Sequence, residues 1–300
     1  MPIDLTGLEI LPQENNYWFV RTEGGQYFDT FYDNDFIAIG WNAIKLGDLK
    51  NTPAEVKVKI AKNYEFDLED RFGKSRVTEI YNKLIRFRDL KKNDIIVIPS
   101  ERSAKFAFGI VESSRTYETD ENSEGCEFQK RKKVKWVKNV DFTDLDNVFY
   151  KIRRPQHAIS NINDNMEYVD SVMYDVYRKD EYSHFIVRVK LEDNINLLTL
   201  AMTLQDMYKL MQLVNNSFDL KENIDDSFIQ IALQSPGFFN LKQKGIALVI
   251  VAMSLGSQSC KDLHANMSPT DQRKITRFVD QNKNSLDSTR AKLDSLNVHL

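Results

Sequence analysis

The chain has 300 residues, of which 42% are hydrophobic and 28% are charged, and it carries a formal net charge of -3 with a pI of about 5.9. These proportions are ordinary for a soluble globular protein, and the net negative charge argues against a protein that coats nucleic acid over its whole surface, although it allows a local basic site. The two cysteines, Cys126 and Cys260, are too few and too far apart for a disulfide framework or a zinc site, which favours a reducing cytoplasm.

Apolar runs and apolar residues spaced three and four apart predict the secondary structure of the first 140 residues. Strands are expected at 16–22, 36–41, 95–98, 105–113 and 132–140, and helices at 27–35, 51–64 and 75–90. Thr52 followed by Pro53 is typical of a helix N-cap and first helical position. The polar stretch 119–129 is expected to be a loop.

The sequence changes character at 150–165, where we expect a short terminal helix and a linker. Beyond it, strands are expected at 183–191 and at 226–237, the second closed by a Ser-Pro-Gly turn, and amphipathic helices at 196–214 and 268–296. The apolar run 246–255 spans ten residues, short of the roughly 20 that a membrane helix needs, and fits either a buried helix or a buried strand. The first ten residues lack the features of a signal peptide.

These elements predict an α+β protein of two domains. Residues 1–160 would form a mostly β domain, and residues 161–300 an α/β domain that ends in amphipathic helices.

A ligand site is suggested where the strand at 36–41 ends in Gly40 and Trp41, followed by Asn42. An aromatic face can stack on a nucleobase, and an amide carries the donor and acceptor that a base edge requires. The alternative is that Trp41 closes the end of a hydrophobic core, which is the commoner use of such a residue.

A basic run near residue 130 is the second candidate. Five cations follow one another without an acid, namely Lys130, Arg131, Lys132, Lys133 and Lys135. They would bind phosphates along a track, or they would protect a solvated strand edge from pairing.

No catalytic constellation is evident. The four histidines are scattered, neither cysteine has a neighbouring histidine, and no phosphate-binding glycine motif follows a strand. We therefore expect no metal or cofactor, and a binding module is favoured over an enzyme, although enzymatic activity stays open.

Several ordered motifs of the first half resemble one known family. The segments YWFVRTEGGQYFDTFYDNDFIAIGW (17–41), LKKNDIIVIPSERSAKFAFGIVESSRTYE (90–118) and KKVKWV (132–137) resemble the EVE-like branch of the PUA-like superfamily. The matching positions are Trp18–Arg21, Ile37–Trp41, Asp94–Val97, Phe108–Val111 and Val134–Trp136, and Asn93 stands where the family usually has glycine.

The resemblance covers about residues 15–160 and implies a small β-barrel with flanking helices. Relatives hold a flipped or modified base in an aromatic pocket and occur beside restriction and phage-defence modules. Carried onto this chain, it implies a base-binding pocket made by Tyr17, Trp18, Trp41, Asn42 and Phe106.

The leading hypothesis is thus a cytoplasmic module of a prokaryotic restriction or antiviral defence system that reads a base of DNA or RNA. The C-terminal domain would sense or interact, with helices 196–214 and 269–296 available for a protein partner or self-association, and no membrane is involved. The alternative is a sensor or protein-interaction subunit whose pocket holds a nucleotide or another small ligand. The sequence leaves open DNA against RNA, the modification and the oligomeric state.

Overall fold

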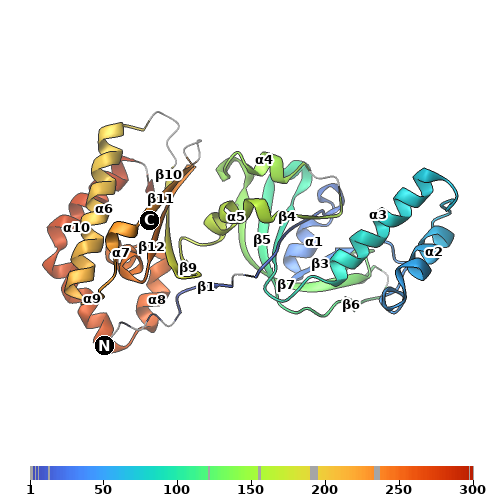
Figure 1. Ribbon diagram of the computed structural model, residues 1–300, viewed down its shortest axis with the longest axis horizontal. Coiled ribbons are helices and arrows are strands. Elements are labelled where there is room, and N and C mark those ends of the chain that lie inside the picture. Colours follow the sequence, from blue (N-terminus) through green and yellow to red (C-terminus); the bar gives the residue numbers. More distant parts are fainter. Residues whose placement is uncertain are drawn as a thin grey trace. The chain divides into compact units, whose positions relative to one another are not determined.

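The computed structural model describes residues 3, 5, 7–12, 14–120, 122–154, 157–189, 195–232, 237–296 and 298–299 (Figure 1). The chain forms two compact units, and its class is α+β, as expected. The N-terminal unit comprises residues 15–143 and 148–166, and the C-terminal unit comprises residues 1–14, 144–147 and 167–300.

A mixed sheet forms the centre of the N-terminal unit. Its strands are β2 (Tyr17–Val20), β3 (Phe36–Ile39), β4 (Ile95–Pro99), β5 (Lys105–Val111), β6 (Tyr117–Glu118), β7 (Lys130–Asp141) and β8 (Ile159–Asn161). They lie in the order β3-β7-β5-β4-β2-β8, with β6 beside β7. Neighbours are antiparallel except for the parallel pair β2 and β4.

The long strand β7 gives this sheet its curl. Residues 130–133 pair with β3, and residues 134–141 pair with β5, where the register shifts between Phe108 and Gly109. Because one strand passes from one partner to the next and also carries a bulge within its pairing with β5, the sheet bends around its core. The core includes β3, whose four residues are all buried, and this burial explains its uninterrupted apolar sequence.

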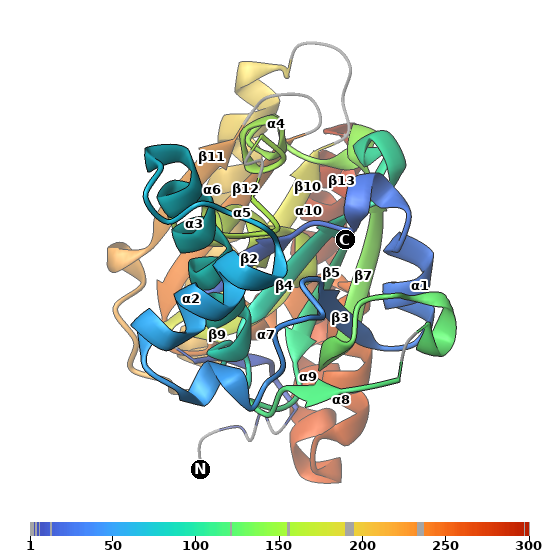
Figure 2. The same ribbon diagram turned by 90° about the vertical axis from the view of Figure 1, so that its right-hand side faces the viewer.

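Helices of the N-terminal unit are α1 (Phe28–Asp33), α2 (Pro53–Asn63), α3 (Arg71–Arg88) and α4 (Phe149–Ile152). Thr52 caps α2 as expected, since its side chain accepts a hydrogen bond from the Glu55 N–H in a complete capping box. The capping residue of α3 is Asp70, so this helix begins one turn earlier than predicted. Figure 2 shows α2 and α3 side by side, and α3 carries a side chain that reaches the pocket described below.

The C-terminal unit contains a second sheet. Its strands are β1 (Ile10–Leu11), β9 (Val176–Lys179), β10 (Tyr182–Val189), β11 (Phe228–Ala232), β12 (Gly237–Lys244) and β13 (Val298–His299). They follow the order β1-β9-β10-β12-β11, and β13 pairs with the end of β10. The predicted first domain, 1–160, differs from the N-terminal unit of the structure at its start. Residues 1–14 belong to the C-terminal unit, because Ile10 and Leu11 pair with β9.

The helices of the C-terminal unit are α5 (Met166–Met173), α6 (Leu197–Ser217), α7 (Ala247–Leu255), α8 (Lys261–Asn266), α9 (Pro269–Gln281) and α10 (Lys283–Ser295). Helices α6 to α10 all contribute to the core on one face of this sheet, whereas Tyr168 of α5 packs with Ile186 and Phe238, which point to the other face. All nine residues of α7 are buried, so the apolar run 246–255 is a core helix and not a strand. Leucines and methionines of α6 and leucines of α10 join the same core. Much of the apolar surface of these two helices therefore packs inside the unit, whereas Leu197, Leu198 and Met202 of α6 are exposed.

Three predictions of secondary structure were wrong in detail. The expected linker at 150–165 contains β8, which pairs with β2 inside the first sheet. The single helix expected at 268–296 is two helices, α9 and α10, which meet at Asn282. The expected strand at 226–237 corresponds to β11 and the first residue of β12, Gly237. Ser235 and Pro236 of its Ser-Pro-Gly turn lie outside the described residues.

Candidate ligand pocket

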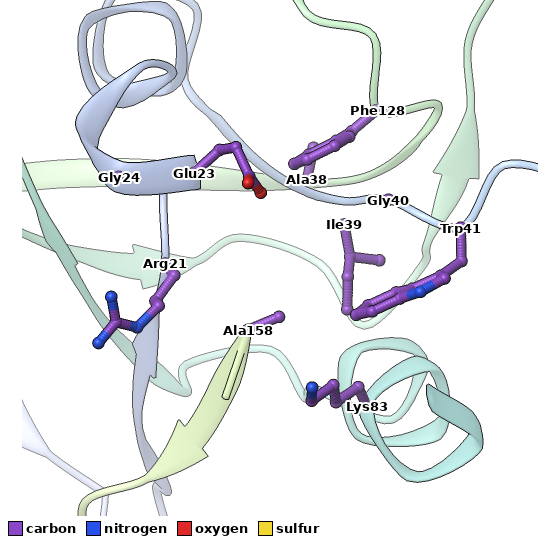
Figure 3. A pocket seen from close by; sticks show the side chains of 10 residues that line it. All are labelled: Arg21, Glu23, Gly24, Ala38, Ile39, Gly40, Trp41, Lys83, Phe128 and Ala158. Atoms are coloured by element: carbon purple, nitrogen blue, oxygen red, sulfur yellow. The ribbon is translucent and has the colours of Figure 1, made fainter. Parts of the chain in front are cut away.

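A pocket of about 450 Å³ opens in the N-terminal unit where β3 ends (Figure 3). It is lined by residues from β3 and the turn after it, the segment after β2, helix α3, the loop before β7 and the residue before β8: Arg21, Glu23, Gly24, Ala38, Ile39, Gly40, Trp41, Lys83, Phe128 and Ala158. This volume lies within the range of small-molecule sites in proteins.

Trp41 forms one aromatic wall and is held in an unusual backbone conformation. Its φ angle is 57°, in the left-handed region that a bulky residue rarely adopts. Two donors hold its carbonyl oxygen: the Ile44 N–H at 3.0 Å and the Lys130 ammonium at 3.0 Å. This backbone conformation directs the half-buried indole of Trp41 toward the pocket.

Phe128 forms the second aromatic wall, and Asn42 fixes it in place. The Asn42 side-chain amide donates to the Glu127 carbonyl at 2.7 Å and accepts from the Gln129 N–H at 3.1 Å, so it holds the residues on both sides of Phe128. The Phe128 ring packs edge-on against Tyr27, with centroids 5.0 Å apart. A Cβ atom at Gly40 would lie 3.1 Å from this ring, so a larger residue there would press against Phe128.

Glu23 enters the pocket from the loop that follows β2. This loop is tightly fitted at Gly25, where φ is 106° and an added Cβ would lie 2.2 Å from the Glu101 backbone. Only glycine adopts this conformation without strain, so Gly25 fixes the loop and with it the position of Glu23. Figure 3 shows the Glu23 carboxylate directed into the space beside Ala38, whereas the Arg21 guanidinium turns away from Trp41. Arg21 donates to the Arg153 carbonyl at 3.3 Å.

Lys83 brings a positive charge to the pocket from the middle of α3. Its ammonium nitrogen lies 5.5 Å from the centroid of the Trp41 ring, within range of a cation–π interaction. The same nitrogen pairs with Glu79 at 2.5 Å, one helical turn earlier. Glu79 also contacts His157 and Arg76, and hydrogen bonding from Lys83, the largest cause, holds the pKa of the Glu79 carboxyl below its usual value. Glu79 therefore stays ionised and orients the lysine.

The structure brings only Trp41 of the five predicted base-binding residues into the pocket. Tyr17 is 1% exposed and Phe106 is fully buried, so neither has a free ring face, because their strands turn these rings into the core. The indole N–H of Trp18 donates to Asp94 at 3.1 Å, away from the pocket lining. Asn42 binds the backbone beside Phe128 with both ends of its amide and does not line the pocket.

The basic run is also mostly internal, which contradicts the predicted phosphate track. Lys130, Arg131 and Lys132 are 1% exposed or less. The Lys132 ammonium donates to the Leu90 and Ser114 carbonyls, and Arg131 donates to the Phe128 and Cys126 carbonyls with its guanidinium 4.1 Å from the Phe36 ring. Burial lowers the pKa of Lys130 and of Lys132 to about 8 each.

Lys133 and Lys135 are the two cations of the run that remain exposed, and neither lines the pocket. β7 alternates between core and solvent from residue 132 to residue 135, but lysine stands at a buried position as well as at both exposed ones, so the sequence did not reveal this alternation. The burial of Lys130 and Arg131 was hidden because they bind backbone carbonyls, which no sequence pattern marks, and because the one acidic partner of Arg131, Glu124, lies in the preceding loop.

Three pocket residues were missed by sequence reasoning: Glu23, Lys83 and Phe128. Phe128 is the only aromatic residue in its polar loop, which is a weak signal that it packs somewhere specific. Glu23 and Lys83 gave no signal, because charged residues in a loop and on a helix are ordinary surface residues.

Within the described part of the chain, no group of three or more His, Cys, Asp or Glu side chains could hold a metal ion. Among the helices of the same residues, none combines the length and the apolar character needed to cross a membrane.

Comparison with protein families gives one match. The model described as "Domain of unknown function (DUF8426)" matches residues 18–163, a little under half of the chain. The matched segment contains all ten residues that line the pocket. Neither the curated proteins nor the solved structures give a match.

Proposed function

We propose that the N-terminal unit is a PUA-like domain of the EVE-like type that binds a base of DNA or RNA in the Trp41 pocket. The observation that carries this proposal is the pocket itself: two aromatic walls, Trp41 and Phe128, around a space with charged groups at its edge. A flat ring stacks on such walls, and its polar edge pairs with the charged groups.

The distribution of charge between the two units supports a nucleic-acid ligand. The N-terminal unit holds 26 Lys and Arg against 22 Asp and Glu, a net charge of +4, whereas the C-terminal unit holds 15 against 22, a net charge of -7. A positive unit attracts phosphates even though the whole chain is negative.

The resemblance stated above supports the wider role. We propose that the chain acts in the cytoplasm as part of a prokaryotic restriction or antiviral defence system, with modified bases among its ligands. The C-terminal unit would then pass the signal to a protein partner.

A second candidate function is favoured by the burial of Lys130, Arg131 and Lys132. With these cations inside the fold, the phosphate track of the sequence hypothesis is reduced to Lys133 and Lys135. A pocket without a phosphate track suits a free nucleotide, and the chain would then be a nucleotide sensor.

The test is binding of short labelled DNA and RNA, single-stranded and duplex, methylated and unmethylated, to the full chain at low and high salt. Loss of one stacking contact removes roughly 1–3 kcal/mol, so Trp41→Ala should weaken binding about 5- to 150-fold. Trp41→Phe should weaken it less, and Trp18→Phe, whose indole binds Asp94, is the matched control.

Salt separates the two candidate functions. Phosphate contacts make the affinity for a nucleic acid fall steeply as salt rises, whereas a ring held by Trp41 and Phe128 without a phosphate track shows a shallow dependence. Equal binding by the Trp41→Phe, Trp41→Ala and unsubstituted proteins would refute the site.

A further inference from the structure

Two side chains determine the polar character of the pocket: Glu23 and Lys83. The remaining lining is apolar or glycine, except for Arg21, which turns toward the Arg153 carbonyl. Within the described residues, Glu23 makes no side-chain hydrogen bond, and the Lys83 ammonium uses one of its three N–H donors on Glu79. The pocket therefore offers a carboxylate that only accepts hydrogen bonds and an ammonium that only donates them.

These two side chains determine which hydrogen-bonding groups the edge of a bound ring must carry. The two oxygens of a carboxylate are best satisfied by two adjacent N–H donors. An ammonium is best satisfied by a carbonyl oxygen, as in the frequent pairing of lysine with O6 of guanine. The ring must therefore carry two neighbouring donors with a carbonyl next to them.

Guanine meets this demand with N1–H, the N2 amino group and O6 along one edge. Adenine and cytosine each offer one amino group beside a ring nitrogen that accepts, and uracil offers one N–H between two carbonyl groups. With any of these three, one carboxylate oxygen would face an acceptor or find no donor on the ring. Glu23 is exposed in the free protein, so that oxygen would lose water on binding without gaining a partner, which is disfavoured.

We propose that the pocket selects guanine, with the Glu23 carboxylate accepting from N1–H and the N2 amino group, and Lys83 donating to O6. Trp41 and Phe128 hold the ring by its faces, and Glu79 orients Lys83. This inference rests on the proposed function, because it names the base that the same pocket binds.

The first experiment is calorimetric titration of the full chain with the 5′-monophosphates of guanosine, inosine, xanthosine, adenosine, cytidine and uridine. We expect guanosine monophosphate to bind at least tenfold tighter than the adenosine, cytidine and uridine forms. Inosine monophosphate, which lacks the N2 amino group, should be intermediate. Xanthosine monophosphate should bind worst, since it places a carbonyl where Glu23 needs a donor.

Substitution of Glu23 gives a readout that a merely structural role would not produce. In Glu23→Gln, the amide accepts from N1–H and donates to the second carbonyl of xanthine, so the preference should move from guanosine toward xanthosine monophosphate. Glu112→Gln, at an exposed residue after β5, is the matched control and should leave the order unchanged. Lys83→Met should reduce the preference for guanosine monophosphate, with Lys74→Met, exposed on the same helix, as its control.

Oligonucleotide arms identify the source of the base. We would measure binding of thymidine decamers with a single central guanine, adenine or cytosine, and of their RNA counterparts. Preferential binding of the guanine decamer shows that the pocket binds guanine within a strand. Binding of guanosine monophosphate but of no decamer shows that it binds the free nucleotide. Binding that depends on Trp41 but treats all bases alike would overturn the guanine assignment and keep the proposed function. The absence of binding across the whole panel would overturn both.

Discussion

Replacement of Lys130 by methionine is expected to change stability and ligand binding in opposite directions. The Lys130 side chain is 1% exposed, and its ammonium donates to the Trp41 carbonyl at 3.0 Å. Methionine has a similar length and no charge, so Lys130→Met fills the same space without a buried ion. It also removes one of the two hydrogen bonds that hold the Trp41 turn.

The magnitude follows from the pKa of Lys130, which burial lowers from 10.5 to about 8. At about 1.4 kcal/mol for each pKa unit, burial of the charged form destabilises the folded state by about 3 kcal/mol at pH 7. Between pH 8 and 10.5 the unfolded chain binds this proton and the folded chain does not, so the free energy of unfolding rises with pH in this window. By pH 10 the destabilisation has fallen to about 1 kcal/mol.

Urea unfolding of both proteins from pH 7 to pH 10 measures this effect. The stability of Lys130→Met relative to the unsubstituted protein should fall by about 2–3 kcal/mol over this range, because only the unsubstituted protein gains from loss of the proton. Lys132, whose pKa is also lowered to about 8, contributes equally to both proteins and cancels. Lys133→Met, at an exposed neighbour, is the control.

Ligand binding should weaken in the same variant, because the Trp41 carbonyl keeps only the Ile44 N–H. Loss of one hydrogen bond of about 1 kcal/mol corresponds to a roughly fivefold lower affinity. A variant that is less stable than the unsubstituted protein at pH 7, with a stability difference that does not depend on pH, would refute the reasoning about the buried ammonium.

Two further predictions concern single positions. Gly25→Ala should destabilise the N-terminal unit by more than about 2 kcal/mol, because the new Cβ would lie 2.2 Å from the Glu101 backbone. Gly24→Ala, whose Cβ would have no atom within 4 Å, should show only the smaller effect of its positive φ. The urea midpoints of the two variants measure the difference. In the C-terminal unit, burial lowers the pKa of His184 from 6.5 to about 4, so stability is fully present above pH 6.5 and should fall by about 3 kcal/mol as the pH drops to 4. His184→Gln should remove most of this acid sensitivity, and His264→Gln, on α8, should not; equal acid sensitivity in both variants would assign the loss to other groups.

Local patterns identified the elements of the fold, because each depends on residues close together in the chain. The cap at Thr52 and the buried run of β3 are examples. Asn93 is another, since it takes a left-handed φ of 72° at the turn where the motif that this segment resembles has glycine, and asparagine tolerates this conformation.

The strand β8 and the placement of β1 were missed because they depend on residues far apart in the chain. β8 has three residues and β1 has two, too few for a period to show, and each is defined by pairing with a distant strand. Pairing of this kind depends on tertiary contacts that the short sequence does not encode by itself.

The roles of the pocket residues also depend on tertiary contacts that the sequence did not reveal. Asn42 and Lys130 were chosen as ligand contacts because an amide and a lysine suit a base and a phosphate. In the structure both side chains hold the protein's own backbone: Asn42 fixes the loop that carries Phe128, and Lys130 fixes the turn that carries Trp41.

This arrangement has a consequence for how substitutions should be interpreted. Polar residues that support the two aromatic walls will alter the affinity for every ring that enters the pocket, because they act through the position of Trp41 and Phe128. Residues that face the ring edge, Glu23 and Lys83, will instead alter the order in which different rings bind. A comparison of Asn42→Ala with Glu23→Gln over the same set of nucleotides therefore separates support of the pocket from recognition within it, even where both variants lose affinity.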